Sequence, residues 1–155
     1  MVDFIEDLRH QTLGHDKVNQ LRHVRFFSDI HGMVEHMRKH ADIIRPKFEL
    51  VENILEEHLG ELNVGTWTKP RGGYFIMFDS LPGCAKEIVA LMKKAGVVMT
   101  PAGATWPYGK DPNDSNIRIA PTYPTLTELK TAMETFTICV RIASVKKILA
   151  DRAAH

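Results

Sequence analysis

Residues 64–80, VGTWTKPRGGYFIMFDS, carry the clearest β-sheet pattern of the chain. The two ends of this segment, 64–68 and 74–78, are rich in β-branched and aromatic residues, and 69–73 between them holds one proline and two glycines. Extended runs separated by a short segment of this composition are typical of two strands joined by a turn. We therefore expect a β-hairpin here.

The residues after the hairpin show a helix pattern and two further strand patterns. Ser80 can cap a helix, and Gly96 can end it in a left-handed conformation. Further strands are expected at 97–100 and 116–120, separated by a long loop (101–115) of a length that is usually functional. The core face of the helix would carry Cys84, Ile88, Leu91, Met92 and Ala95.

A long helix is expected before the hairpin. Over residues 29–62, apolar side chains recur at steps of three and four, the period of one helical face. Pro46 lacks a backbone N–H, so we expect a kink or a break near Arg45. Gly60 is the predicted end of this helix.

The last helix begins with a recognisable cap. Thr125 and Glu128 have the capping-box spacing, in which each side chain bonds a free amide of the other residue. The helix should run to about Leu149. Its predicted buried stripe consists of Leu129, Met133, Phe136, Val140 and Ala143.

This order of elements predicts an α+β fold. We expect a small, mostly antiparallel sheet covered on one face by helices, with a long N-terminal helix. Residues 1–28 are polar and basic and would form a poor core. They are therefore interpreted as a segment that packs against another part of a protein. Residues 29–155 are the predicted domain.

Composition excludes several classes of protein. With 155 residues, 44% hydrophobic and 25% charged, the chain suits one soluble domain, and a net charge of +1 attracts neither nucleic acid nor a membrane surface. The start does not resemble a secretory signal, and no apolar run approaches the ~18 residues of a membrane span. Cys84 and Cys139 are expected to be free, buried thiols. These features predict a cytoplasmic protein.

Arg118 is the residue best suited to bind a ligand. In the predicted strand NIRIAP (116–121), Ile117 and Ile119 would face the helices, so Arg118 points to the other side. Its planar guanidinium can bind a carboxylate through two parallel hydrogen bonds. The alternative is an arginine on an exposed sheet face with no ligand.

Two other pairs could carry chemistry. His36 and His40 are four residues apart, a spacing that can bind a metal from one helical face, but the glutamate of an HExxH motif is missing, which favours an exposed polar face. Trp106 and Tyr108 in the long loop would either line a substrate entrance or pack the loop itself.

Three motifs, in order, resemble the C-terminal part of fold-type-I (class I) aminotransferases: GGYF (72–75), VMTPAGAT (98–105) and NIRIAP (116–121). The segment GHDKVNQLRHVRF (14–26) is similar to a bacterial subgroup known as aspartate aminotransferases. The resemblance covers about residues 3–149. It implies that the chain is the small C-terminal domain of such an enzyme.

The resemblance also implies roles for individual residues. In the family, the arginine at the position of Arg118 binds the α-carboxylate of the substrate. Asn116 is a second candidate for substrate binding. Lys17, Arg22 and Arg25 fall in a region near the dimer interface where the superfamily often places a cation for a dicarboxylate side chain; the alternative is solvated surface charge.

The family implies pyridoxal phosphate as the cofactor of the full-length enzyme. Its Schiff-base lysine, the aspartate that pairs with the pyridine nitrogen and most phosphate-binding groups belong to the large domain, upstream of the part that resembles residues 1–10. We therefore expect no cofactor, catalytic residue or metal on this chain. The isolated chain should be inactive.

The implied partners are an amino acid, with aspartate expected, a 2-oxo acid, the large cofactor-binding domain, and a second subunit of a homodimer. Two alternatives come from other functional classes. One is a stand-alone module in which Arg118 holds a carboxylate without catalysis. The other is a nucleic-acid binder that uses residues 22–26, which the balanced charge does not favour.

Overall fold

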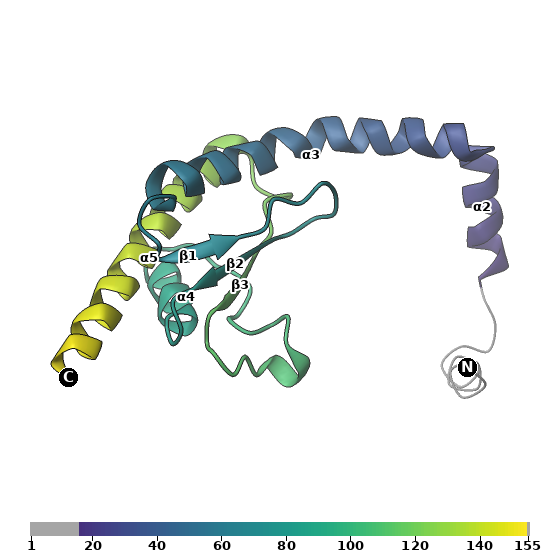
Figure 1. Cartoon of the computed structure of the whole chain (residues 1–155). Helices are drawn as coiled ribbons and strands as arrows, with labels where there is room; N and C mark the ends of the chain where they lie inside the picture. Colours follow the sequence, from purple (N-terminus) through teal and green to yellow (C-terminus); the bar gives the residue numbers. More distant parts are fainter. Residues whose placement is uncertain (1–15, 155) are drawn as a thin grey trace. The chain divides into compact units, whose positions relative to one another are not determined.

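The computed structural model describes residues 16–154 (Figure 1). The chain divides into two compact units, the first ending at Ile43 and the second beginning at Ile44, and each is described by itself. The part of segment 1–28 that precedes Asp16 lies outside the described residues. So does the N-terminal stretch that argued against a secretory signal.

The first unit consists of helix α2 (Lys17–Phe27) and the first half of α3 (Ile30–Leu59). Asp16 caps α2 by accepting a hydrogen bond from the Asn19 amide at 2.9 Å. No residue of α2 is buried. An 11-residue helix is marginal in water without packing, so α2 gains little stability from the described residues alone.

Helix α3 passes through Pro46 without a break, so of the kink or break predicted near Arg45 the break is wrong, and the kink stays a prediction. Proline removes the hydrogen bond to the carbonyl four residues earlier, and that carbonyl belongs to Asp42, an exposed residue. The helix ends at Leu59, directly before Gly60, as predicted. Its second half supplies the core residues Phe48, Val51, Ile54, Leu55 and Leu59.

The second unit contains the predicted antiparallel sheet. Strands β1 (Gly65–Trp67), β2 (Ile76–Ser80) and β3 (Asn116–Ile119) lie in the order β1-β2-β3. The β1–β2 pair confirms the hairpin, and Met77 of β2 is opposite Arg118 of β3. The α+β class is confirmed.

The strand predicted at 97–100 is wrong. These residues have no strand pairing, and the Val97 amide donates to the Met92 carbonyl at 2.9 Å, back toward the preceding helix. Val98 is 86% exposed. β-branched residues form a strand only where they can pack on a pleated, half-buried surface. Residues 97–100 do not pair with an edge strand of the sheet, so they lack such a surface.

Helices α4 (Ala85–Lys94) and α5 (Leu126–Ala153) complete the unit. They pack on the sheet face that carries Ile76, Phe78, Ile117 and Ile119, all buried. The rings of Phe78 and Phe136 meet edge to face, with centroids 5.1 Å apart. The opposite face of the sheet, with Arg118, is therefore left for other contacts.

The predicted cap of α4 is wrong. Ser80 is the last residue of β2, and its hydroxyl donates to the carbonyls of Leu81 and Ser115. Asp114 satisfies the start of α4 instead: its carbonyl accepts from Ala85 and its carboxylate from Lys86. On the predicted core face, Cys84, Ile88 and Met92 are buried, Leu91 is half-buried and Ala95 is exposed. Gly96, with φ +88°, ends the helix as predicted.

The capping box at the start of α5 is confirmed, with Glu128 and Thr125 each accepting from the other's amide. The helix continues to Ala153, four residues past the predicted end. The predicted stripe is buried, and Cys84 and Cys139 are free, buried thiols. Among residues 16–154, no helix has the length and apolar character to span a bilayer.

Candidate functional site

Arg118 is half-buried on the sheet face opposite Ile117 and Ile119. Its guanidinium carbon lies 4.4 Å from the centre of the Phe75 ring, a cation–π distance. Among the described residues 16–154, its one hydrogen bond is long, 3.5 Å from Nη2 to Oγ1 of Thr100, and its buried Nε has no partner. Within residues 16–154, no carboxylate forms an ion pair with it. The charge is held in place but not neutralised.

Asn116 lies on the same face of β3, two residues before Arg118, and is buried. Its Nδ2 donates to Oδ1 of Asp79 at 2.7 Å, and its Oδ1 accepts from the Thr105 hydroxyl at 2.6 Å. Both polar ends of the amide are therefore occupied by the protein. In this arrangement Asn116 ties the long loop to the sheet.

Asp111 is a positioning residue that the sequence reasoning missed. Its carboxylate accepts from the amides of Asn113, Ser115 and Asn116 at 2.8–2.9 Å, which fixes the chain entering β3. Burial raises the pKa of Asp111, but these backbone donors outweigh it and hold the pKa below its usual value. The available signal was an aspartate followed by Asn, Asp and Ser, a composition typical of Asx turns.

The rest of the loop is closely folded near its start and open at its tip. Gly103 is buried with φ +77°, and a Cβ there would come within 3.0 Å of the Gly109 carbonyl, so glycine is required. Trp106 is 42% exposed and Tyr108 96% exposed. Tyr108 therefore does not pack the loop.

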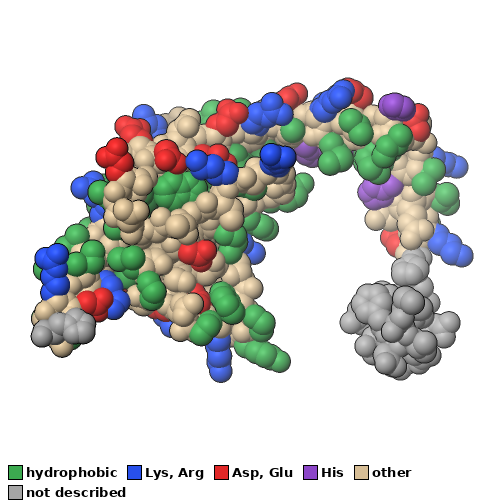
Figure 2. Space-filling view, in the orientation of Figure 1, with side chains coloured by type: hydrophobic (Ala, Val, Ile, Leu, Met, Phe, Trp, Pro, Cys, Tyr) green, Lys and Arg blue, Asp and Glu red, His purple; other side chains and the backbone are tan. Residues whose placement is uncertain are grey.

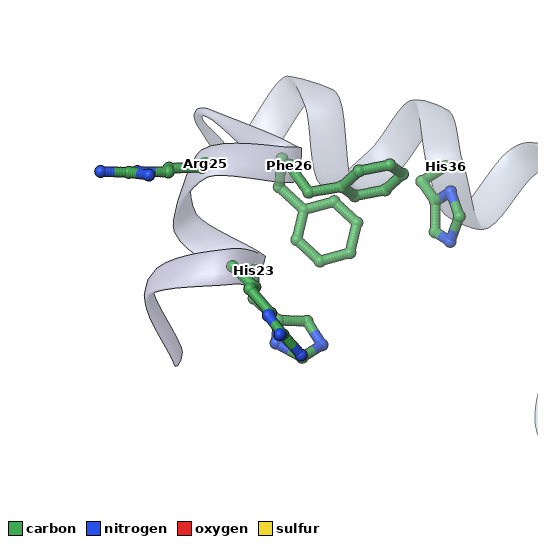
Figure 3. A pocket seen from close by; sticks show the side chains of 6 residues that line it. His23, Arg25, Phe26 and His36 are labelled. Carbon is green, nitrogen blue, oxygen red and sulfur yellow. The ribbon is translucent and has the colours of Figure 1, made fainter. Parts of the chain in front are cut away.

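The other predicted candidates belong to the first unit. Lys17, Arg22 and Arg25 are exposed on α2. A hollow of about 650 Å³ lies beside Arg22 and Arg25. In Figure 3 the Arg25 side chain extends away from the rings of Phe26 and His36. The hollow is lined by Arg22, His23, Arg25, Phe26, Phe27 and His36.

His36 and His40 come together, with their Nε2 atoms 3.0 Å apart. His40 is exposed, and the His36 ring makes T-shaped contacts with the rings of Phe26 and Phe27, with centroids 5.2 and 5.4 Å apart. In the described part of the chain, no group of three or more His, Cys, Asp or Glu residues is placed to hold a metal. Two imidazoles fall short of the three or four ligands of a protein zinc site.

The described lysines do not form a site for a cofactor held as a Schiff base. Lys47 and Lys147 are half-buried, but one donates to the Thr122 carbonyl at 2.7 Å and the other pairs with Asp151. The remaining lysines of residues 16–154 are exposed. A pyridoxal phosphate cradle therefore does not fit the described residues by themselves.

Comparisons with known proteins give a consistent result. A family model described as aspartate amino-transferase matches residues 2–152. A Mycolicibacterium smegmatis protein that carries an aminotransferase name is 46% identical over 149 residues, which are 96% of this chain and 35% of that protein. An aspartate aminotransferase of Corynebacterium glutamicum is 44% identical over 86% of this chain and 31% of its own length. The chain thus spans about a third of these relatives.

Solved structures show the same relationship. The crystal structure of an aspartate transaminase from Corynebacterium glutamicum matches with a TM-score of 0.84 and 41% identity, over 93% of this chain and 34% of that one. A kynurenine aminotransferase from Pyrococcus horikoshii matches with a TM-score of 0.63 over 76% of this chain and 28% of that one. At 21% identity, the second match shows a shared fold alone.

Proposed function

Because the chain belongs to the aspartate amino-transferase family, we propose that it is the domain that closes over the substrate in a pyridoxal-phosphate-dependent aminotransferase. The complete enzyme would exchange an amino group between aspartate and a 2-oxo acid. Since the chain spans about a third of its relatives, the rest of the enzyme would supply the remaining groups of the site.

The observation that supports this proposal is that the positive charge of Arg118 forms no ion pair within residues 16–154. Its guanidinium is backed by Phe75, carries one long hydrogen bond, and has no carboxylate partner in residues 16–154. A substrate carboxylate would supply the missing charge and two parallel, charge-assisted hydrogen bonds. We therefore propose that Arg118 binds the α-carboxylate.

The surrounding residues would orient this arginine. β3 is hydrogen-bonded to β2, and Asp111 and Asn116 fix its entrance and the loop beside it. A binding group on a rigid element holds its ligand more precisely than one on a mobile loop, and it loses less entropy on binding. Closure of the domain over the substrate would also exclude water.

The cofactor would be held by the large domain. Pyridoxal phosphate, when bound, supplies an electron sink for the carbon that loses its proton. None of the described lysines is placed to carry it, which agrees with a cofactor lysine outside this chain. The isolated chain would then bind no cofactor and catalyse no transfer.

The remaining parts of the proposal concern the role of the first unit and the cellular location of the enzyme. Residues 1–28 would connect to the large domain or to its interface, and residues 29–155 would be the small domain. Lys17, Arg22 or Arg25, all exposed, would meet the side-chain carboxylate of a dicarboxylic substrate at a homodimer interface. Such an enzyme would work in the cytoplasm.

Substitution of Arg118 in the full-length enzyme tests the proposed role. Loss of one partner of a buried ion pair costs about 3–5 kcal/mol, so Arg118→Ala should lower kcat/KM for aspartate by roughly 10²- to 10⁴-fold. Arg118→Lys should recover only part of this loss, because lysine lacks the planar fork. Steady-state kinetics over a range of aspartate concentrations would measure it.

Arg152→Ala is the matched control, because Arg152 is exposed near the end of α5 and should leave the kinetics unchanged. Circular dichroism would establish that each variant is folded. A folded Arg118→Ala enzyme with unchanged kcat/KM for aspartate would refute the assignment.

A further inference from the structure

Phe75 is a large aromatic side chain that lies outside the core of the second unit. It is 44% exposed, and it directly precedes the first residue of β2. Within residues 16–154, no other aromatic ring packs against it. Hydrophobic side chains also reach the surface near the turn of the β1–β2 hairpin (Figure 2). Core packing therefore does not explain a phenylalanine at this position.

The contact that Phe75 makes is with Arg118. Met77 of β2 is directly opposite Arg118, and Phe75 is two residues before Met77, on the same side of the chain by strand alternation. Phe75 is thus diagonally across from Arg118, at a separation that an aromatic and a long side chain can bridge. The guanidinium carbon accordingly lies over the Phe75 ring, 4.4 Å from its centre.

Apart from this ring, the guanidinium of Arg118 is weakly held. In the part of the chain that the structure describes, it has one hydrogen bond, 3.5 Å long, to the Thr100 hydroxyl, and no ion pair. An arginine side chain has many rotamers, and fixing one of them costs entropy. If the ligand had to fix the rotamer, that cost would weaken binding. The Phe75 ring is the contact best placed to order the guanidinium before a ligand binds.

An aromatic ring can hold a cation without neutralising it. The face of the ring carries partial negative charge and attracts a cation above it. An acidic side chain at position 75 would hold Arg118 more firmly, but it would also neutralise the charge that a carboxylate ligand needs. The ring therefore suits an arginine that has to be ordered and yet remain available to a ligand.

We propose that Phe75 is a positioning residue, whose ring orders the Arg118 guanidinium for the substrate carboxylate through the negative charge of the ring face. This inference rests on the proposed function, because it takes Arg118 as the group that binds the carboxylate. The alternative is a phenylalanine that only covers apolar surface. The two differ in one measurable property, because only the positioning role depends on the electron density of the ring.

Fluorinated phenylalanines at position 75 of the full-length enzyme test this property. Each ring fluorine withdraws electron density from the face and changes the shape little. With one, two and three fluorines, KM for aspartate should rise stepwise, to roughly threefold to tenfold, as expected for loss of a cation–π contact. The value of kcat should change by less than about twofold, since the contact is made in the ground state and the transition state alike. A KM independent of fluorination would overturn the proposal.

Ordinary substitutions give a second readout. Phe75→Leu should raise KM by a similar factor, whereas Phe75→Tyr keeps a ring face and should retain most of the affinity. Tyr123→Leu is the matched control, because Tyr123 is an aromatic residue of the second unit that is 98% exposed, and KM should stay unchanged. Circular dichroism would establish that each variant is folded. Equal losses in Phe75→Leu and Phe75→Tyr would contradict a role for the ring.

The Arg118→Ala background separates this inference from the proposed function. In that background Phe75→Leu should cause no further rise in KM, because no guanidinium remains to be ordered. An equal rise in both backgrounds would overturn the positioning role of Phe75 and leave the role of Arg118 intact. Unchanged kcat/KM in Arg118→Ala alone would instead overturn the proposed function, and this inference with it.

Discussion

Two polar side chains on one face of β3, Asn116 and Arg118, differ in their hydrogen-bond partners. Asn116 is joined at both ends to protein partners, Asp79 and Thr105, whereas Arg118 keeps its charge unpaired over Phe75. Alternation along a strand predicts that both face away from the helices. Alternation does not predict that Asn116 is hydrogen-bonded within the protein while Arg118 stays free for a ligand. That difference depends on residues distant in the sequence, such as Thr105 of the long loop.

Asp111 makes a pH-dependent contribution that can be measured. The folded-state pKa of its carboxyl is lowered, so its stabilising effect is present above the unfolded pKa of about 4 and is lost as pH falls through the folded pKa. Asp111→Asn should therefore destabilise the chain most at neutral pH. Urea unfolding of both proteins from pH 3 to pH 7 should show the difference shrinking below about pH 4. A constant difference across this range would contradict the assignment.

At the scale of elements, the two helices that pack together begin in different ways. α5 is capped by its own residues, Thr125 and Glu128. α4 is capped by Asp114, whose carboxylate accepts a hydrogen bond from the amide of Lys86, 28 residues earlier in the chain. Its own N-cap residue, Cys84, makes no side-chain capping bond. A local cap can be recognised in a sequence, whereas a cap supplied by a distant loop cannot.

The capping box of α5 should contribute measurably to stability. Thr125→Ala removes the hydroxyl that accepts from the Glu128 amide at 3.3 Å, and loss of such a cap costs about 1 kcal/mol. Thr127→Ala, an exposed position in the first turn, serves as the control and should stay within about 0.5 kcal/mol. Thermal or urea unfolding would compare them. Equal stability of the two variants would argue against the cap.

At the scale of the whole molecule, the apolar surface is unevenly covered. The second unit has a continuous core beneath the sheet, whereas α2 buries no residue. Large apolar side chains of the first unit, Leu21, Phe26, Met33 and Met37 among them, are exposed. This distribution agrees with the proposal that the chain is one part of a longer enzyme; the chain spans about a third of the length of its curated relatives.

The isolated chain should not behave as an enzyme. Borohydride reduction with pyridoxal phosphate should leave every lysine substoichiometrically modified, because none of those described combines an unpaired amine with an enclosed site. Intact-mass spectrometry and an assay with aspartate and 2-oxoglutarate would measure this. One lysine modified stoichiometrically, with turnover, would refute the proposal. Tight calorimetric binding of aspartate without cofactor would favour a stand-alone carboxylate-binding module.

Local sequence patterns were enough to predict the α+β class, the hairpin, the two long helices, the start of α5 and the left-handed end of α4. These features depend on interactions between residues close in the chain: helical and strand periods, a cap formed by two residues three positions apart, and a glycine with positive φ. The motifs that resemble the aminotransferase family were also visible in it, and the family match confirms them.

Long-range contacts, by contrast, leave residues 97–100 outside the sheet and place Ser80 at the end of a strand. They also bring Asp114 to the start of α4, give Asn116 its partners, and leave exposed the α5 residues Ile138, Ile142, Val145 and Leu149. One cause applies in each case. Strand pairing, distant caps and burial depend on residues far apart in the chain, and a local pattern records what a residue prefers but not which partner reaches it.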